Sequence, residues 1–135
     1  MSIEENKATI RRMVENFNRR DLAFIEEIFS PHFILHTALT AGWSRGLEGA
    51  RKMFTTMLST APDIHATIED IFSEGDKVAV RWTFRGTHTG ESLLRGAPTG
   101  EQFTAVAIAL YRFANGKIEE DWGVDARWQS GQVWE

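Results

Sequence analysis

The sequence predicts a single α+β domain over residues 1–135, in which helices come first and strands of an antiparallel sheet follow. Two patterns and the composition support this fold class. Before Pro62 the apolar residues recur at helical spacing, and after Pro62 they alternate as in strands. The chain has 135 residues, of which 42% are hydrophobic and 25% charged, as in an ordinary globular domain.

Three helices are expected before Pro62. The first begins with a capping box, in which Ser2 is the N-cap and Glu5 the third helical residue. The second begins near Asp21 and ends at Ser30-Pro31. The third carries an apolar stripe over residues 47–58 and ends before Pro62. Between the second and third helices we expect a short strand at 32–38 and a loop at 39–46.

The region after Pro62 predicts a run of antiparallel strands. The alternation that starts at Ile64 changes phase near Glu69-Asp70, which indicates a β-bulge. A turn at 74–76 and a Gly/Thr-rich connection at 86–100 separate the next strands. The last two strands are expected at 101–113 and 117–128.

The turn between the last two strands allows their register to be predicted. Asn115-Gly116 is typical of a two-residue type I′ turn. If the ladder is regular, Tyr111 lies opposite Glu120 and Ala109 opposite Trp122. We therefore expect Trp122, Tyr111 and Glu120 to share the face covered by the helices. Glu120 would then form an ion pair with Arg81 or another strand arginine, or act in catalysis, and Asp121 would be a surface charge.

The other face of this hairpin is also apolar, with Val106, Ile108 and Leu110 in alternate positions. An antiparallel sheet usually has one face in water. We therefore expect a second copy of the chain to cover this face and form a homodimer.

Composition excludes several classes of function. There is no cysteine, and therefore no disulfide, thiolate metal site or cysteine nucleophile. The net charge is −4 and no basic run occurs, so neither nucleic acid nor a membrane is an expected partner. No apolar run approaches the roughly 18 residues of a membrane span, and no signal peptide is evident, which indicates a cytoplasmic protein. Metal-binding and nucleotide-binding motifs are absent from the sequence.

Some ionisable and aromatic residues could converge on one site. Five Trp and nine Phe residues suit a thick core or a cavity for a flat, hydrophobic ligand. His36 follows an apolar run and is either a buried neutral histidine or an acid/base group. His88 lies in a loop, where it either organises a turn or contacts a ligand. The full candidate set is His36, Arg81, Trp82, His88, Tyr111, Glu120, Trp122 and Asp125. Such groups suit proton transfer next to a carbonyl.

Four segments of the chain form a familiar series, GLEGARKMF, APDIHATIEDIFSEGDKVAVRWTFRGTHTGE, APTGEQFT and FANGKIEEDWGVD. They resemble the SnoaL-like polyketide cyclases, a family of the nuclear-transport-factor-2-like superfamily. The resemblance implies a cone-shaped fold with three N-terminal helices on a curved, mostly antiparallel sheet. It also implies a hydrophobic pocket, a homodimer and catalysis without cofactor or metal.

The resemblance also implies a catalytic acid/base on the last strand. In the cyclases this aspartate usually lies four residues past the Trp of the E-x-W motif, whereas here Asp125 lies three residues past Trp122 and Ala126 lies at four. We therefore predict a bulge at Gly123 that turns Asp125 toward the pocket. The tail ARWQSGQVWE also departs from the family's Leu-rich ending.

Two classes of function stay open from the sequence. In the first, the chain is an enzyme in which Asp125 removes a proton next to a carbonyl and His36 or Arg81 stabilises the enolate oxygen, as in intramolecular aldol ring closure. Other acid/base enzymes of the superfamily, such as isomerases, dehydratases and epoxide hydrolases, belong to this class. In the second, the chain is a non-catalytic module that binds a small ligand or dimerises.

Overall fold

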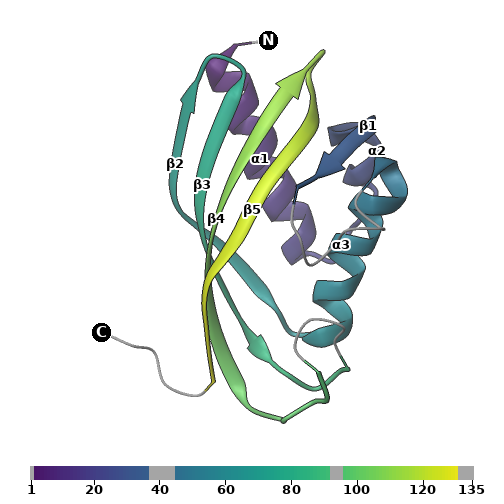
Figure 1. Ribbon diagram of the computed structural model, residues 1–135, viewed down its shortest axis with the longest axis vertical. Coiled ribbons are helices and arrows are strands. Elements are labelled where there is room, and N and C mark those ends of the chain that lie inside the picture. Colours follow the sequence, from purple (N-terminus) through teal and green to yellow (C-terminus); the bar gives the residue numbers. More distant parts are fainter. Residues whose placement is uncertain (1, 37–44, 92–95, 131–135) are drawn as a thin grey trace.

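The computed structural model describes residues 2–36, 45–91 and 96–130, with side chains described as far as residue 123. The elements in chain order are α1 (Ile3–Asn18), α2 (Phe24–Ile28), β1 (Phe29–Leu35), α3 (Gly46–Thr60), β2 (His65–Glu74), β3 (Lys77–Thr87), β4 (Gln102–Ala114) and β5 (Lys117–Ser130). The helices lie on one side of a curved five-stranded sheet (Figure 1). The strand order is β1-β5-β4-β3-β2, and only β1 runs parallel to its neighbour. The predicted α+β class is confirmed.

Helix α1 begins as its sequence predicts and is fixed to the sheet at its end. The Ser2 hydroxyl accepts from the Glu5 amide and the Glu5 carboxylate accepts from the Ser2 amide, each at 3.0 Å, which confirms the capping box. At the other end, the Asn18 side chain donates to the Ala66 carbonyl and accepts from the Ala66 amide, both at 2.9 Å. These two bonds dock α1 on the first residues of β2.

The second helix is shorter than predicted. It ends at Ile28, and β1 begins at Phe29 instead of at residue 32. A residue that precedes proline is disfavoured in the helical region, so Ser30 before Pro31 has to be extended. The end of the predicted strand and most of the predicted loop, residues 37–44, lie outside the described residues.

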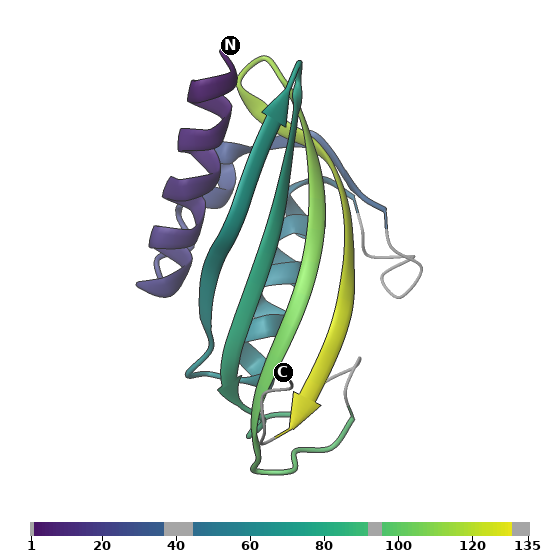
Figure 2. The ribbon, with the colours of Figure 1, turned by 90° about the vertical axis from the view of Figure 1, so that its left-hand side faces the viewer.

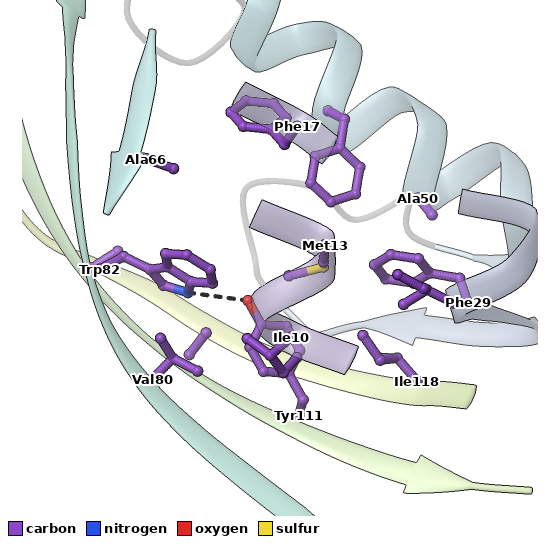
Figure 3. Close-up of a cluster of buried hydrophobic side chains, with 14 of the residues drawn as sticks. Ile10, Met13, Phe17, Phe29, Ala50, Ala66, Val80, Trp82, Tyr111 and Ile118 are labelled. Carbon is purple, nitrogen blue, oxygen red and sulfur yellow. Dashed lines mark hydrogen bonds between the residues drawn. The ribbon is translucent and has the colours of Figure 1, made fainter. Parts of the chain in front are cut away.

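The core lies between the helices and the concave face of the sheet, here called the inner face (Figure 3). The Phe54 ring of α3 contacts three other phenylalanine rings at centroid distances of 5.0 to 5.8 Å. Those rings belong to Phe17, Phe24 and Phe29. Aromatic pairs of this kind, together with buried aliphatic side chains, attach all three helices to the sheet.

The β2–β3–β4 part of the sheet follows the sequence pattern. The register of β2 shifts between Ile68 and Asp70, which confirms the predicted bulge. The β4–β5 turn has positive φ at Asn115 (53°) and Gly116 (78°), as a type I′ turn requires. The first predicted pair beyond the turn, Phe113 with Ile118, is also confirmed.

The predicted register of β5 is wrong beyond this pair. Arg112 lies opposite Glu120, so Glu119 is an extra residue that forms a bulge. A shift of one residue exchanges the faces of all following side chains. Tyr111 therefore lies opposite Asp121, while Glu120 and Trp122 face the other side of the sheet.

The predicted bulge at Gly123 is also wrong. Gly123 pairs regularly with Ala109, and the next irregularity leaves Ala126 unpaired between Asp125 and Arg127. Asp125 lies opposite Ala107 in the ladder. The direction of the Asp125 side chain lies outside the described residues.

The second side of the sheet, here called the outer face, is covered by none of the described helices (Figure 2). Its exposed apolar side chains include Phe72, Ile108 and Trp122, which are 68%, 50% and 36% exposed. None of the helices in the described part of the chain is long and apolar enough to cross a membrane.

Candidate functional site

The inner face of the β4–β5 hairpin holds a buried carboxyl group, that of Asp121. Asp121 is 4% exposed, and its Oδ1 atom is buried without a hydrogen-bond partner among the described residues. Removal from water destabilises the charged form, and burial raises the pKa of Asp121 to about 7. A carboxyl group with this pKa can both take up and release a proton near neutral pH.

Tyr111 faces Asp121 from the neighbouring strand. The two residues are direct cross-strand partners, which places their Cβ atoms about 4.5–5.5 Å apart. The Trp82 indole N–H donates to the Tyr111 hydroxyl oxygen at 3.1 Å (Figure 3). Burial, and then the charge of Asp121, raise the pKa of Tyr111 well above its usual range. The phenol therefore stays protonated, and its own hydrogen is directed away from Trp82.

Small residues of β4 and β5 lie beside the Asp121 carboxyl group. A Cβ atom added at Gly123 would lie 3.2 Å from Asp121 Oδ1 and 3.7 Å from the Ala109 Cβ atom. The next buried positions of β4 on the same face are Ala107 and Ala105. Short side chains thus extend from the carboxyl group along β4, between the sheet and the helices.

The predicted site residues Glu120, His36 and Trp122 come together, but on the outer face. Glu120 accepts from Arg112 Nε through one carboxylate oxygen and contacts His36 Nε2 through the other, each at 2.6 Å. The His36 ring stacks on Trp122, with centroids 4.8 Å apart and planes 6° from parallel. Hydrogen bonds from Arg112 and then His36 lower the pKa of Glu120. The expectation that Glu120 pairs with a strand arginine is confirmed, with Arg112 as the partner.

The structure separates the other predicted site residues. Arg81 lies on the outer face and binds Asp70 at 2.6 Å. His88 is buried at the far end of β3, where its backbone N–H donates to the Glu101 carbonyl and its carbonyl accepts from Gly100. These bonds join the two ends of the β3–β4 connection. Of the predicted set with described side chains, only Tyr111 lies directly opposite Asp121, and Trp82 contacts the Tyr111 hydroxyl.

Asp121 is the residue that sequence reasoning missed, because the bulge at Glu119 changes its face. One signal of its position existed in Gly123, since a glycine within a strand often marks a close approach. The group that approaches is the Asp121 carboxyl. Among the described residues, no three His, Asp or Glu side chains form a group that could hold a metal ion.

The family model of the SnoaL-like polyketide cyclases matches residues 7–130. The chain belongs to the SnoaL-like polyketide cyclase family. A curated relative, the aklanonic acid methyl ester cyclase AcmA of Streptomyces galilaeus, is 30% identical over 124 residues. This match covers 89% of the chain and 85% of AcmA.

Solved structures of the family share the fold. AclR from Streptomyces galilaeus, a candidate hydroxylase, is 31% identical with a TM-score of 0.77, covering 92% of this chain and 90% of AclR. IdmH from Streptomyces antibioticus, a candidate polyketide cyclase, is 32% identical with a TM-score of 0.76, covering 90% of this chain and 91% of IdmH. The helices on a curved sheet are therefore those of a SnoaL-like cyclase.

Proposed function

We propose that this chain is a cyclase that closes a ring in a small apolar carbonyl compound by an intramolecular aldol reaction, with Asp121 as the acid/base. The observation that carries the proposal is the buried carboxyl group of Asp121, with its pKa raised to about 7 and a protonated phenol opposite it. Family membership supplies the reaction class. The name of AcmA supplies one candidate substrate, aklanonic acid methyl ester.

The reaction follows from these two groups. The Asp121 carboxylate removes a proton from a carbon next to a carbonyl group, and the electron pair moves onto the carbonyl oxygen to give an enolate. The enolate carbon then adds to a second carbonyl carbon of the same molecule, which forms the new C–C bond. The resulting alkoxide takes the proton back from Asp121. Because atoms and electrons balance within the substrate, the cycle needs no cofactor.

Tyr111 is the proposed donor to the enolate oxygen. Its oxygen already accepts from Trp82 at 3.1 Å, so its hydrogen can be offered to a substrate oxygen. A donor fixed in place before the reaction stabilises the charge that develops in the transition state. This role replaces the one expected for His36 or Arg81, whose side chains bind carboxylates on the outer face.

The proposed substrate position is the strip of small residues beside Asp121. Gly123 and Ala109 carry no side chain longer than a methyl group beside the carboxyl group, and Ala107 continues this strip along β4. The aromatic rings of Trp82 and Phe84, stacked at 5.8 Å, border this strip on β3. A flat hydrophobic carbonyl compound suits such surroundings.

The test uses aklanonic acid methyl ester as substrate and compares two variants. Asp121→Asn should lower the rate of ring closure by about 10²–10⁴-fold, the usual contribution of a general base. Asp125→Asn is the matched comparison, because the family resemblance gives the acid/base role to Asp125. Loss of activity in Asp125→Asn alone would return the role to Asp125 and contradict the proposal.

The same experiment separates the enzyme from a non-catalytic binding module. If the wild-type protein is stabilised by the ester in a thermal shift assay but never converts it, the chain binds a ligand without catalysis. If neither binding nor conversion occurs, this ester is the wrong ligand. A panel of other aromatic polyketide esters then provides the next substrates for the same two variants.

We also propose that two copies of the chain pack through their outer faces. Phe72, Ile108 and Trp122 expose large apolar side chains there, and none of the described helices covers them. Contiguous apolar patches on a sheet commonly mark protein interfaces. The expected homodimer would remove these side chains from water and would not contact the inner faces, which the helices cover.

A further inference from the structure

The bulge at Glu119 determines which carboxyl group enters the core. In the observed register, Tyr111 lies opposite Asp121 and Arg112 lies opposite Glu120. The same turn is compatible with a regular ladder, in which Tyr111 would lie opposite Glu120 and Ala109 opposite Trp122. The two registers differ by one residue and therefore place opposite sets of side chains inside.

Burial of apolar surface favours the regular ladder. That register would bring Trp122 into the core and leave Asp121 outside. The observed register does the reverse, because Asp121 is 4% exposed while Trp122 is 36% exposed. Each register buries one carboxyl group, Asp121 in the observed ladder and Glu120 in the regular one, but only the observed register exposes the Trp122 indole, which is unfavourable. Other interactions must therefore stabilise the bulged register.

Those interactions surround Glu120 on the outer face. Arg112 and His36 each bind one oxygen of its carboxylate at 2.6 Å. His36 also donates its backbone N–H to the Asp121 carbonyl at 2.8 Å and stacks its ring on Trp122. His36 thus contacts three successive residues of β5. The contacts of its ring require residues 120 and 122 to face outward.

We propose that His36, Arg112 and Glu120, here called the Glu120 cluster, hold β5 in the bulged register and thereby position Asp121 on the inner face opposite Tyr111. Charge-assisted hydrogen bonds to both carboxylate oxygens are strong enough to compete with the burial of one aromatic side chain. Glu120 and His36 are positioning residues, since they face away from Asp121 and act through the strand. Their link to catalysis rests on the proposed function, whereas their effect on the register does not.

The decisive variant is Glu120→Leu, which removes the carboxylate and makes position 120 suitable for the core. We expect β5 to adopt the regular ladder. In nuclear magnetic resonance spectra, cross-strand contacts of Tyr111 should then be with residue 120 instead of Asp121. The chemical shift of the Asp121 carboxyl carbon should then report a pKa near the ordinary aspartate value of about 3.9, because the carboxyl group has become exposed. Retention of the Tyr111–Asp121 contacts would overturn the proposal.

The matched control is Asp70→Leu. Asp70 also follows a bulge, faces the outer side and binds an arginine Nε at 2.6 Å, that of Arg81. This variant should leave the Tyr111–Asp121 contacts and the Asp121 titration unchanged. If both variants shift the register equally, the effect comes from general loss of outer-face ion pairs and the proposal fails.

A second variant keeps the test decisive if Glu120→Leu does not fold. Glu120→Gln keeps the size of the side chain and removes only its charge. We expect Glu120→Gln to accelerate amide hydrogen exchange at residues 119–123. This acceleration should be at least 10-fold larger than the one that Asp70→Asn causes at the same residues. Equal acceleration in the two variants would contradict the proposal.

These results are independent of the proposed function. If Glu120→Leu changes the register while Asp121→Asn retains full cyclase activity, the register inference stands and the catalytic role of Asp121 fails. If Asp121→Asn loses activity while Glu120→Leu keeps the observed register, the catalytic role stands and the inference about the Glu120 cluster fails.

Discussion

At the scale of single residues, the Asp121 carboxyl group links the fold to proton chemistry. Its pKa in the folded chain is about 7, compared with 3.8 for an exposed aspartate, and burial is the cause. Between these two values the folded state holds a proton that the unfolded state has released. The Asp121 contribution to the free energy of unfolding therefore falls as the pH rises from about 4 to 7.

The first prediction concerns this pH dependence. Between about pH 4 and 7 the contribution of Asp121 to the free energy of unfolding should decrease by up to about 4 kcal/mol, since a difference of one pKa unit corresponds to about 1.4 kcal/mol. Asp121→Asn should remove the decrease, so its stability relative to wild type should rise from pH 4 to pH 7 and then stay level. Denaturant unfolding at fixed protein concentration measures this difference. Asp63 and Glu120, whose pKa values are lowered, affect stability below about pH 4.5 and therefore overlap only the acid end of this interval.

The second prediction concerns Tyr111. Tyr111→Phe should lower kcat/KM for ring closure by about 10²–10³-fold, because it removes the donor to the enolate oxygen. It should also destabilise the fold by about 1–3 kcal/mol, because the buried Trp82 N–H loses its acceptor. Trp82→Phe is the control, since it retains the phenol while it removes the orienting bond and shortens a buried ring. A larger kinetic loss in Trp82→Phe than in Tyr111→Phe would contradict the donor role.

At the scale of elements, side-chain bonds to the backbone fix α1 against the sheet. Asn18 satisfies both backbone groups of Ala66, a buried residue at the start of β2. Arg20 adds bonds to the Pro62 and Ile64 carbonyls at 2.8 and 2.6 Å. Helix α1 is thereby held in place beside β2, where its apolar stripe forms one wall of the core.

The third prediction tests this docking. Asn18→Ala should lower the free energy of unfolding by about 1–3 kcal/mol, because it leaves the Ala66 amide and carbonyl without their partners. Asn16→Ala is the control on the same helix, since within the described ranges the Asn16 carboxamide accepts only from the exposed Arg19 side chain. It should change stability by less than about 0.5 kcal/mol. Equal effects of the two variants, measured by denaturant unfolding, would show that the Asn18 bonds contribute little.

At the scale of the whole molecule, the sheet separates two sets of residues with different tasks. The inner face carries the buried Asp121 and Tyr111 together with the core, and the outer face carries exposed apolar side chains and ion pairs. A second copy bound at the outer face would therefore not contact Asp121 or Tyr111.

The fourth prediction tests this arrangement. Ile108→Lys should convert the expected dimer to a monomer, because it would bury an unpaired charge in the interface. Thr55→Lys, at an exposed position of α3, should leave the dimer intact. Sedimentation equilibrium measures both masses. A monomeric wild-type protein at micromolar concentration would refute the argument from the outer face.

The sequence by itself determined the fold class, the capping box, the bulge after Ile68 and the type I′ turn. Each of these depends on a few neighbouring residues whose conformational preferences agree. The family resemblance was likewise readable, because it rests on motifs spread along the whole chain.

Only the tertiary structure decided which carboxyl group of β5 is buried. The residues next to the turn permit both a regular ladder and a bulge at Glu119, and the apolar pattern favours the regular ladder. The contacts that accompany the bulge come from Arg112 on β4 and from His36 beyond β1, and His36 lies 84 residues away from Glu120 in sequence. A local pattern carries no information about such partners, so the register of β5, and with it the position of Asp121, depends on the assembled sheet.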